Sequence, residues 1–261
     1  MVSRPTFQNA IVRPPAPNFG DGLTTADLGS PDYAIALAQH EAYCAALEHC
    51  GLALTRLPAD HRHPDSTFVE DTAILAGGRA ILTRPGAVSR QGEVAAIYET
   101  LGTFYDHLES IEGPGTLDGG DVCEADGHAI IKLSGRTNED GARQLAAFYS
   151  TAGITSETID VRVIPGVLHL KSGLAYVGHG RMVAIAALAK HPALSRYQVL
   201  TVDPDEEYAA NCILVNDRIL VPAKHPRTRA ALEHHGTELV ELDMSEFQKM
   251  DGGLSCLSLR F

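Results

Sequence analysis

Long apolar segments are absent from this sequence. No stretch approaches the ~18 uninterrupted apolar residues that a membrane-spanning helix needs. The N-terminal residues MVSRPTFQNAIVRPP contain neither the apolar core nor the small-residue cleavage site of a secretory signal. We therefore expect a cytoplasmic protein that has no membrane partner.

Basic residues are scarce relative to acidic ones. Lys and Arg number 21 against 33 Asp and Glu, which gives a net charge of −12 at pH 7. A nucleic-acid-binding protein usually presents a basic face, so we expect no nucleic-acid partner. The negative excess favours attraction of a cationic small molecule, although an acidic soluble surface explains it equally well.

Cysteines are few and irregularly spaced. The chain has five, at Cys44, Cys50, Cys123, Cys212 and Cys256, and no CxxC pair. An odd, irregular set argues against a disulfide framework and against a structural zinc site. No HExxH pattern, P-loop or GxGxxG is present either, so we expect no metal and no cofactor.

The middle of the chain repeats one pattern: two short apolar runs around a turn, then an amphipathic segment, then another short run. The predicted hairpins are 72–83, 121–133, 173–186 and 212–223, and the predicted helices are 92–108, 138–153, 187–196 and 226–235. Self-similarity at roughly 40–50 residues predicts an array of like units.

A fifth unit requires both ends of the chain. Strand 256–261 would pair with strand 9–14, and helix 31–50 and strand 52–57 would complete the unit. Such pairing leaves no free sheet edge. We predict an α/β fold of five pseudo-symmetric ββαβ units in a ring, forming a single catalytic domain over residues 1–261. The alternative is an ordinary α/β sandwich with several hairpins.

Cys256 lies in MDGGLSCLSL, where a glycine-rich loop leads into the closing strand. A cysteine in a chain of this kind, with His and carboxylates elsewhere, is a candidate nucleophile, although its spacing alone favours a small core residue. Other reactive side chains precede the hairpins: Glu70 and Asp71, then Asp118, then His169. A ring would bring them to one cavity around its axis.

This set of residues has a coherent chemistry. A thiolate can attack, a histidine can act first as acid and then as base, and a carboxylate can orient that histidine. Additional carboxylates suit a guanidinium, which is planar, always charged and presents paired N–H groups. Individually, His169 could be a core histidine, and Asp71 and Asp118 could be turn residues.

At this point the sequence resembles the dimethylarginine dimethylaminohydrolase family, within the guanidine-modifying, pentein-fold superfamily. The similarity extends from about residue 10 to the C-terminus. It rests on FVEDTAIL (68–75), TRPGAVSR (83–90), TLDGGDV (116–122), LSGRTN (133–138), LHLKSGLAY (168–176), YAANCILVN (208–216) and DGGLSC (251–256). These motifs are numerous, specific and in the family's order.

The resemblance implies the catalytic roles. Cys256 matches the nucleophile, His169 the general acid and base, and Asp118 the carboxylate that partners this histidine. Some relatives have Glu where this chain has Asp118, which puts the reach of that side chain in question. Glu70 and Asp71 match the carboxylates that bind the guanidinium.

The resemblance also implies the binding residues for the rest of the substrate. Arg90 and Arg136 stand where the α-carboxylate is held, and Asp65 where the α-amino group is contacted. Leu23 stands on the loop that closes over the substrate, and Asp251 matches an acid near the active site. From the sequence alone, both arginines would be interpreted as surface ion-pair partners.

The implied reaction is hydrolysis of an Nω-methylated L-arginine to citrulline and an alkylamine through a covalent thiouronium on Cys256. An arginine deiminase acting on free arginine is the nearest alternative, and a non-catalytic arginine-binding module is a third. The expected partner is a small-molecule substrate, and a homodimer is compatible with the sequence.

Overall fold

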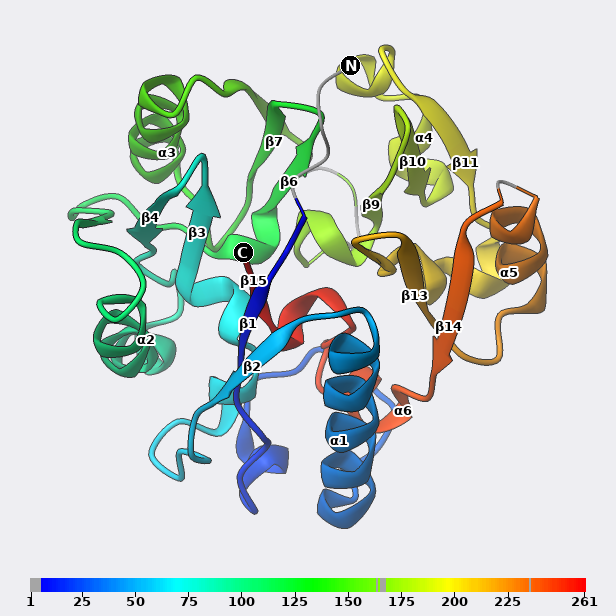
Figure 1. Cartoon of the computed structure of the whole chain (residues 1–261), viewed down its shortest axis with the longest axis horizontal. Helices are drawn as coiled ribbons and strands as arrows, with labels where there is room; N and C mark the ends of the chain where they lie inside the picture. The colour runs from blue at the N-terminus through cyan, green and yellow to red at the C-terminus, as the bar shows by residue number, and fades with distance from the viewer. Residues whose placement is uncertain (1–5, 163, 165–167, 235) are drawn as a thin grey trace.

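The computed structural model describes residues 6–162, 164, 168–234 and 236–261. Five three-stranded sheets are arranged around a common centre, with the helices on the outside (Figure 1). The predicted five-unit α/β ring is therefore confirmed. None of the helices in these ranges is long and apolar enough to cross a membrane.

Four units share one element order: an antiparallel strand pair, a helix, and a strand parallel to the second strand. The first unit has β3 (Ala73–Ala76), β4 (Arg79–Leu82), α2 (Val94–Leu101) and β5 (Leu108–Ser110). The second has β6 (Val122–Ala125), β7 (His128–Leu133), α3 (Glu139–Thr151) and β8 (Thr155–Asp160). The third has β9 (Leu174–Gly178), β10 (Arg181–Ala184), α4 (Ala186–Ala189) and β11 (Gln198–Thr201). The fourth has β12 (Ile213–Val215), β13 (Arg218–Pro222), α5 (Pro226–Glu233) and β14 (Glu238–Leu242), and α6 (Ser245–Gln248) follows it.

The hairpin turns explain why these short apolar runs pair. Gly77 and Gly78 both have positive φ, at 58° and 73°, and Asp126 and Gly127 have φ of 49° and 76°. Two consecutive left-handed residues form the turn whose twist matches that of the flanking strands. Gly, Asp and Asn tolerate this conformation best, so these dipeptides set the register of each hairpin.

Two helices are shorter than the sequence predicted. The segment predicted as helix 92–108 is helical only to Leu101, where Gly102 follows. The segment predicted as helix 187–196 gives only α4, because Pro192 lacks the N–H that would continue the helix. In both places the apolar residues beyond the end of the helix lie in a turn, so their spacing does not mark a further helical turn.

The fifth unit combines both ends of the chain. It consists of β15 (Leu259–Arg260), β1 (Asn9–Val12), α1 (Tyr33–His49) and β2 (Ala53–Arg56). β1 pairs antiparallel with β15 and parallel with β2, and Figure 1 shows blue β1 and red β15 side by side. This unit repeats the connectivity of the other four with its chain break between the first two strands.

The closure of the ring can be tested at Ile11, which is fully buried and faces Leu259 in the strand pairing. Replacement by Ala leaves a cavity there, and we expect Ile11→Ala to lower the free energy of unfolding by roughly 2–5 kcal/mol. Urea denaturation measures this loss. Leu54→Ala, on the half-buried face of β2, is the matched control and should cost clearly less. If both variants lost the same free energy of unfolding, the β1–β15 contact would contribute no more to stability than the contacts of Leu54.

Candidate active site

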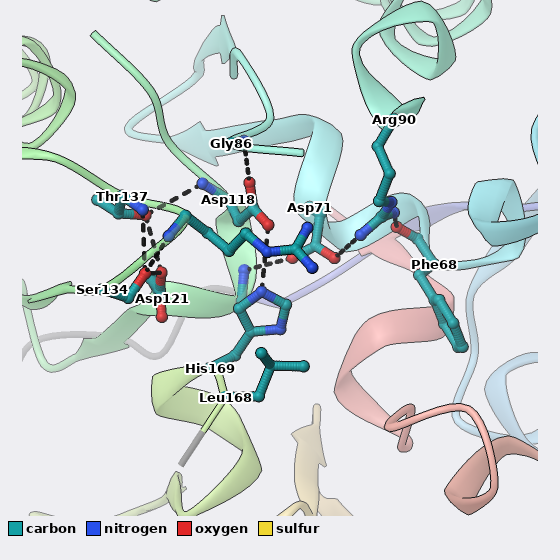
Figure 2. Close-up of polar contacts among 12 residues, drawn as sticks. Phe68, Asp71, Gly86, Arg90, Asp118, Asp121, Ser134, Thr137, Leu168 and His169 are labelled. Atoms are coloured by element: carbon teal, nitrogen blue, oxygen red, sulfur yellow. Dashed lines mark hydrogen bonds and ion pairs between the residues drawn. The ribbon is translucent and has the colours of Figure 1, made fainter. Parts of the chain in front are cut away.

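His169 lies in a buried turn just before β9, where it forms a hydrogen bond with a carboxylate. Its Nε2 is 3.2 Å from Oδ2 of Asp118, and Oδ1 of Asp118 accepts a hydrogen bond of 2.8 Å from the Gly86 backbone N–H (Figure 2). Asp118 is fully buried. The shorter Asp side chain therefore reaches the imidazole, which answers the question raised by its replacement of Glu.

The carboxylates around His169 set its charge. Burial alone lowers the pKa of the imidazole, but Asp71, the hydrogen bond to Asp118, and Asp121 outweigh it and raise the pKa from 6.5 to about 9. His169 is consequently an imidazolium at neutral pH. It carries the proton that a general acid must deliver.

Gly120 allows this cluster to pack closely. A Cβ at Gly120 would lie 2.9 Å from Oδ1 of Asp71 and 3.0 Å from Cγ of His169. The Gly120 N–H also donates to Oδ1 of Asp71 at 2.9 Å. Any side chain at this position would push the imidazole and the carboxylate apart, which explains the second glycine in LDGGD.

Asp71 is held in its charged form. Burial opposes ionisation, yet His169 and Arg90 overcome it and lower the pKa of this carboxyl. Oδ2 of Asp71 accepts a hydrogen bond of 2.6 Å from Nη1 of Arg90. Polar atoms of Asp71, Asp118 and His169 all lie within 4.8 Å of one another. Such spacing could suit a cation, but these atoms already bond to protein partners, so we interpret the group as a hydrogen-bonded network.

Arg90 is placed differently from what the resemblance implies. Its Nε and Nη2 donate to Glu93, at 3.1 and 2.8 Å, and Nη2 also donates to the backbone oxygens of Phe68 and Asp65. The guanidinium is buried and committed to these acceptors. It could take a substrate carboxylate only by releasing some of them, so this role remains a prediction for Arg90.

Arg136 is available to a ligand. Its backbone N–H donates to Oγ of Ser134, and its half-exposed guanidinium makes no hydrogen bond or ion pair with any residue in the described part of the chain. Its positive charge lowers the pKa of Asp65, although burial dominates and keeps that pKa raised. Of the two arginines, Arg136 is therefore the one with an uncommitted guanidinium, and its contact with a carboxylate remains a prediction.

Glu70 lies next to two cationic side chains from distant segments of the chain. Its Oε1 is 2.7 Å from Nζ of Lys171 and 3.5 Å from Nη2 of Arg260. Its Oε2 is buried and has no hydrogen-bond partner among the described residues. A buried carboxylate oxygen without a donor is costly, so this atom is suited to a donor from a ligand.

Cys256 lies on a short 3-10 turn over Ser255–Leu257, not within the last strand as the sequence predicted. The Asn211 side chain fixes this turn by accepting a 2.9 Å hydrogen bond from the Ser255 backbone N–H. Burial, followed by the charges of Glu70 and Asp71, raises the pKa of the Cys256 thiol well above its usual value. Without a cationic ligand in the site, the thiol is therefore protonated.

The segment around Leu23 is fixed over the site by two acids. Both carboxylate oxygens of Asp65 accept from the Leu23 backbone N–H, at 3.0 and 3.2 Å. Asp251 accepts from the backbone N–H and hydroxyl of Thr25, at 2.5 and 2.9 Å. Asp65 and Asp251 thus contact this loop, and contact of Asp65 with a substrate amino group remains a prediction.

A cavity of about 470 Å³ lies beside this loop. Its lining includes Thr25 and Leu28 of the loop, Leu168 next to His169, and Asn211 and Asp251 near the Cys256 turn. Asp251 is the expected site residue in this lining, and neither His169 nor Cys256 contributes to it. The cavity has room for a small organic molecule.

Several residues that build the site escaped the sequence analysis. Each contacts an expected site residue or the residue next to one: Glu93, Lys132, Ser134, Thr137, Lys171 and Asn211. A signal was present for Lys132, since a lysine within the apolar run AIIKL is unusual for a buried strand. No spacing rule would have found Asn211.

The arrangement of five ββαβ units with a cysteine, a histidine and carboxylates at the centre defines the pentein class of fold. No protein-family model matches the chain. A dimethylarginine dimethylaminohydrolase from Pseudomonas aeruginosa is 45% identical over 98% of this chain and 100% of the relative. One from Streptomyces coelicolor is 34% identical over 97% of this chain and 96% of the relative. The chain belongs to the dimethylarginine dimethylaminohydrolase family.

Solved structures agree with this assignment. A cysteine-to-serine variant of the P. aeruginosa enzyme complexed with citrulline matches with a TM-score of 0.95 at 44% identity, covering 98% of this chain and 100% of that one. The N-terminal domain of a cyanobacterial arginine dihydrolase matches with a TM-score of 0.87 at 16% identity over 98% of this chain and 97% of that one. The second likeness shows the shared fold.

The charge of His169 predicts a pH dependence of stability. Because its pKa is about 9 in the folded protein against the ordinary 6.5, the stability it contributes is complete below pH 6.5 and is lost as the pH rises through 9. We expect the difference in free energy of unfolding between the parent and His169→Gln to shrink over this range. Denaturant titrations at several pH values measure it. A constant difference would mean that the folded protein holds a neutral imidazole.

Proposed function

We propose that this protein hydrolyses Nω-methylated L-arginine, as asymmetric dimethylarginine or monomethylarginine, to L-citrulline and the corresponding amine. The observation that carries this proposal is the buried Asp71, which lies against a protonated His169 in the same site as the Cys256 turn. Relatives named dimethylarginine dimethylaminohydrolase, at 45% and 34% identity, support it. We infer that the whole ring acts as one catalytic domain, because these residues come from different units.

The substrate is bound at both ends. Asp71 accepts hydrogen bonds from the guanidinium, and the unpartnered Oε2 of Glu70 provides a further acceptor. Arg136 pairs with the α-carboxylate, while Asp65 receives the α-amino group beneath the loop that carries Leu23. Arg90 holds Asp71 in place through its hydrogen bond. It contacts the α-carboxylate only when it releases some of its other acceptors.

Binding of a cation changes the state of the nucleophile. The Cys256 thiol is protonated in the free site because it is buried near two carboxylates. A guanidinium placed between these carboxylates and the sulfur cancels their charge, so the thiol gives its proton to solvent and becomes a thiolate. The nucleophile thus forms when its substrate is present, and no metal or organic cofactor is required.

The reaction then proceeds in two displacements. The Cys256 thiolate attacks the central guanidinium carbon, the carbon–nitrogen bond breaks, and His169 gives its proton to the leaving alkylamine. Next, His169 takes a proton from water, which attacks the thiouronium carbon and breaks the carbon–sulfur bond. Asp118 holds the imidazole in place through both steps.

Replacement of the nucleophile tests the chemistry. Cys256→Ser should fold normally and lose nearly all turnover, because a hydroxyl is a much weaker nucleophile than a thiolate at neutral pH. The assay measures citrulline and amine from arginine, monomethylarginine, asymmetric dimethylarginine and agmatine. Citrulline with dimethylamine indicates the proposed function, whereas ammonia from arginine indicates a deiminase. A Ser variant that keeps a tenth of the activity would contradict covalent catalysis.

The two arginines should respond differently to truncation. Arg136→Ala should weaken methylarginine binding by roughly 1.5–3 kcal/mol and leave stability unchanged, because it removes a charge-assisted contact to ligand alone. Arg90→Ala should also destabilise the protein, since Asp71 and Glu93 lose their buried partner. Calorimetric binding and thermal unfolding of both variants measure these effects. If Arg136→Ala weakens a guanidine without a carboxylate equally, Arg136 serves another role.

A further inference from the structure

A buried ion pair that the proposed reaction does not use lies behind the active site. Nζ of Lys132, on β7, is 3.5 Å from Oδ1 of Asp121, which follows the glycine pair of LDGGD. Lys132 is 2% exposed and Asp121 is 0% exposed. Two charges removed from water to this degree stabilise a fold poorly. Their location therefore suggests a different role.

The pair holds the backbone on both sides of His169. Nζ of Lys132 donates to the backbone oxygen of Leu168 at 2.7 Å. Oδ1 of Asp121 accepts from the backbone N–H of Leu170 at 3.2 Å. Lys132 is thus hydrogen-bonded to the peptide group before His169, and Asp121 to the peptide group after it.

The same aspartate also reaches the carboxylate partner of His169. Its Oδ2 accepts from Oγ of Ser134 at 2.5 Å and from Oγ1 of Thr137 at 2.8 Å, as Figure 2 shows. Oγ1 of Thr137 in turn accepts from the Asp118 backbone N–H at 3.2 Å. Asp121 therefore fixes the segment of His169 and the segment of Asp118 relative to each other.

We propose that Lys132 and Asp121 are positioning residues, which hold His169 against Asp118 and balance the charge on its imidazole from behind. Their effect on catalysis rests on the function proposed above. Their effect on the imidazole itself does not, because it follows from contacts within the protein.

Because Lys132 and Asp121 carry opposite charges, their separate removal should shift the pKa of His169 in opposite directions. The charged groups that face His169 are Asp71, Asp118 and Asp121, with Lys132 behind Asp121. Removal of Lys132 leaves Asp121 uncompensated and favours the imidazolium. Removal of the Asp121 charge disfavours it. A role in structure alone would not move the imidazole pKa in opposite directions.

The first experiment is an NMR titration of histidine-labelled protein, with the His169 resonance assigned by its loss in His169→Gln. Lys132→Met should raise the pKa of His169 and Asp121→Asn should lower it. The double variant Lys132→Met/Asp121→Asn should return it close to the parent value. An unchanged pKa in both single variants, or shifts in one direction, would overturn the proposal.

The second experiment measures kcat and KM for asymmetric dimethylarginine in the same variants. A misplaced imidazole should lower kcat by roughly 10–100-fold and change KM little, because the groups proposed to bind substrate remain. Ile131→Ala is the matched control, as this buried residue lies on the same strand but on the face opposite to Lys132, where it packs in a hydrophobic core cluster. It should lower stability and keep kcat. Equal kcat losses in Ile131→Ala and Lys132→Met would overturn the proposal.

Folding is checked in every variant by circular dichroism and thermal unfolding. If Lys132→Met does not fold, Lys132→Gln replaces it, since an amide still offers a donor to Leu168 without the charge. If the parent shows no turnover, the proposed function fails, and the NMR titration still decides the role of the pair. If the parent turns over and the variants match it in both pKa and kcat, the positioning role is wrong.

Discussion

The structure depends on burying several carboxylates in one place without leaving any of them uncompensated. Glu70, Asp71, Asp118 and Asp121 are all at most 5% exposed. Each has its own cationic neighbour: Lys171, Arg90, His169 and Lys132, in the same order. Isolated buried charges would cost far more than a domain of this size can tolerate. The paired arrangement keeps a strongly polar centre compatible with folding.

The ring explains how these pairs are assembled from distant parts of the chain. Each unit presents the turn before its first strand to the common centre, and the turns carry FVED, LDGGD, LHLK and GGLSC. The contacts join residues 101 positions apart, as between Lys171 and Glu70, and 226 positions apart, as between Thr25 and Asp251. Closure by β1 and β15 places the Cys256 turn opposite the acids, so the fold and the chemistry require the same strand pairing.

The sequence could predict the architecture because hairpin turns and apolar runs are local signals. Gly77–Gly78 and Asp126–Gly127 mark their turns through backbone conformation alone. Positions before the hairpins predict the reactive residues, and the resemblance alone predicts the residues that bind the rest of the substrate. The hydrogen-bond partners of these residues could not be predicted, because they depend on three-dimensional packing. Arg90, for example, turned out to be engaged with Glu93, and the 3-10 turn under Cys256 depends on Asn211 from another unit.

The central claim is that burial and the nearby carboxylates of Glu70 and Asp71 keep Cys256 protonated until a cationic ligand binds. The most direct test is the ultraviolet absorbance of the thiolate as a function of pH, taken as the difference between the parent and Cys256→Ser, without ligand. The account predicts that thiolate forms only well above the ordinary cysteine pKa of 9.0. A thiolate already present at neutral pH in the free protein would contradict it.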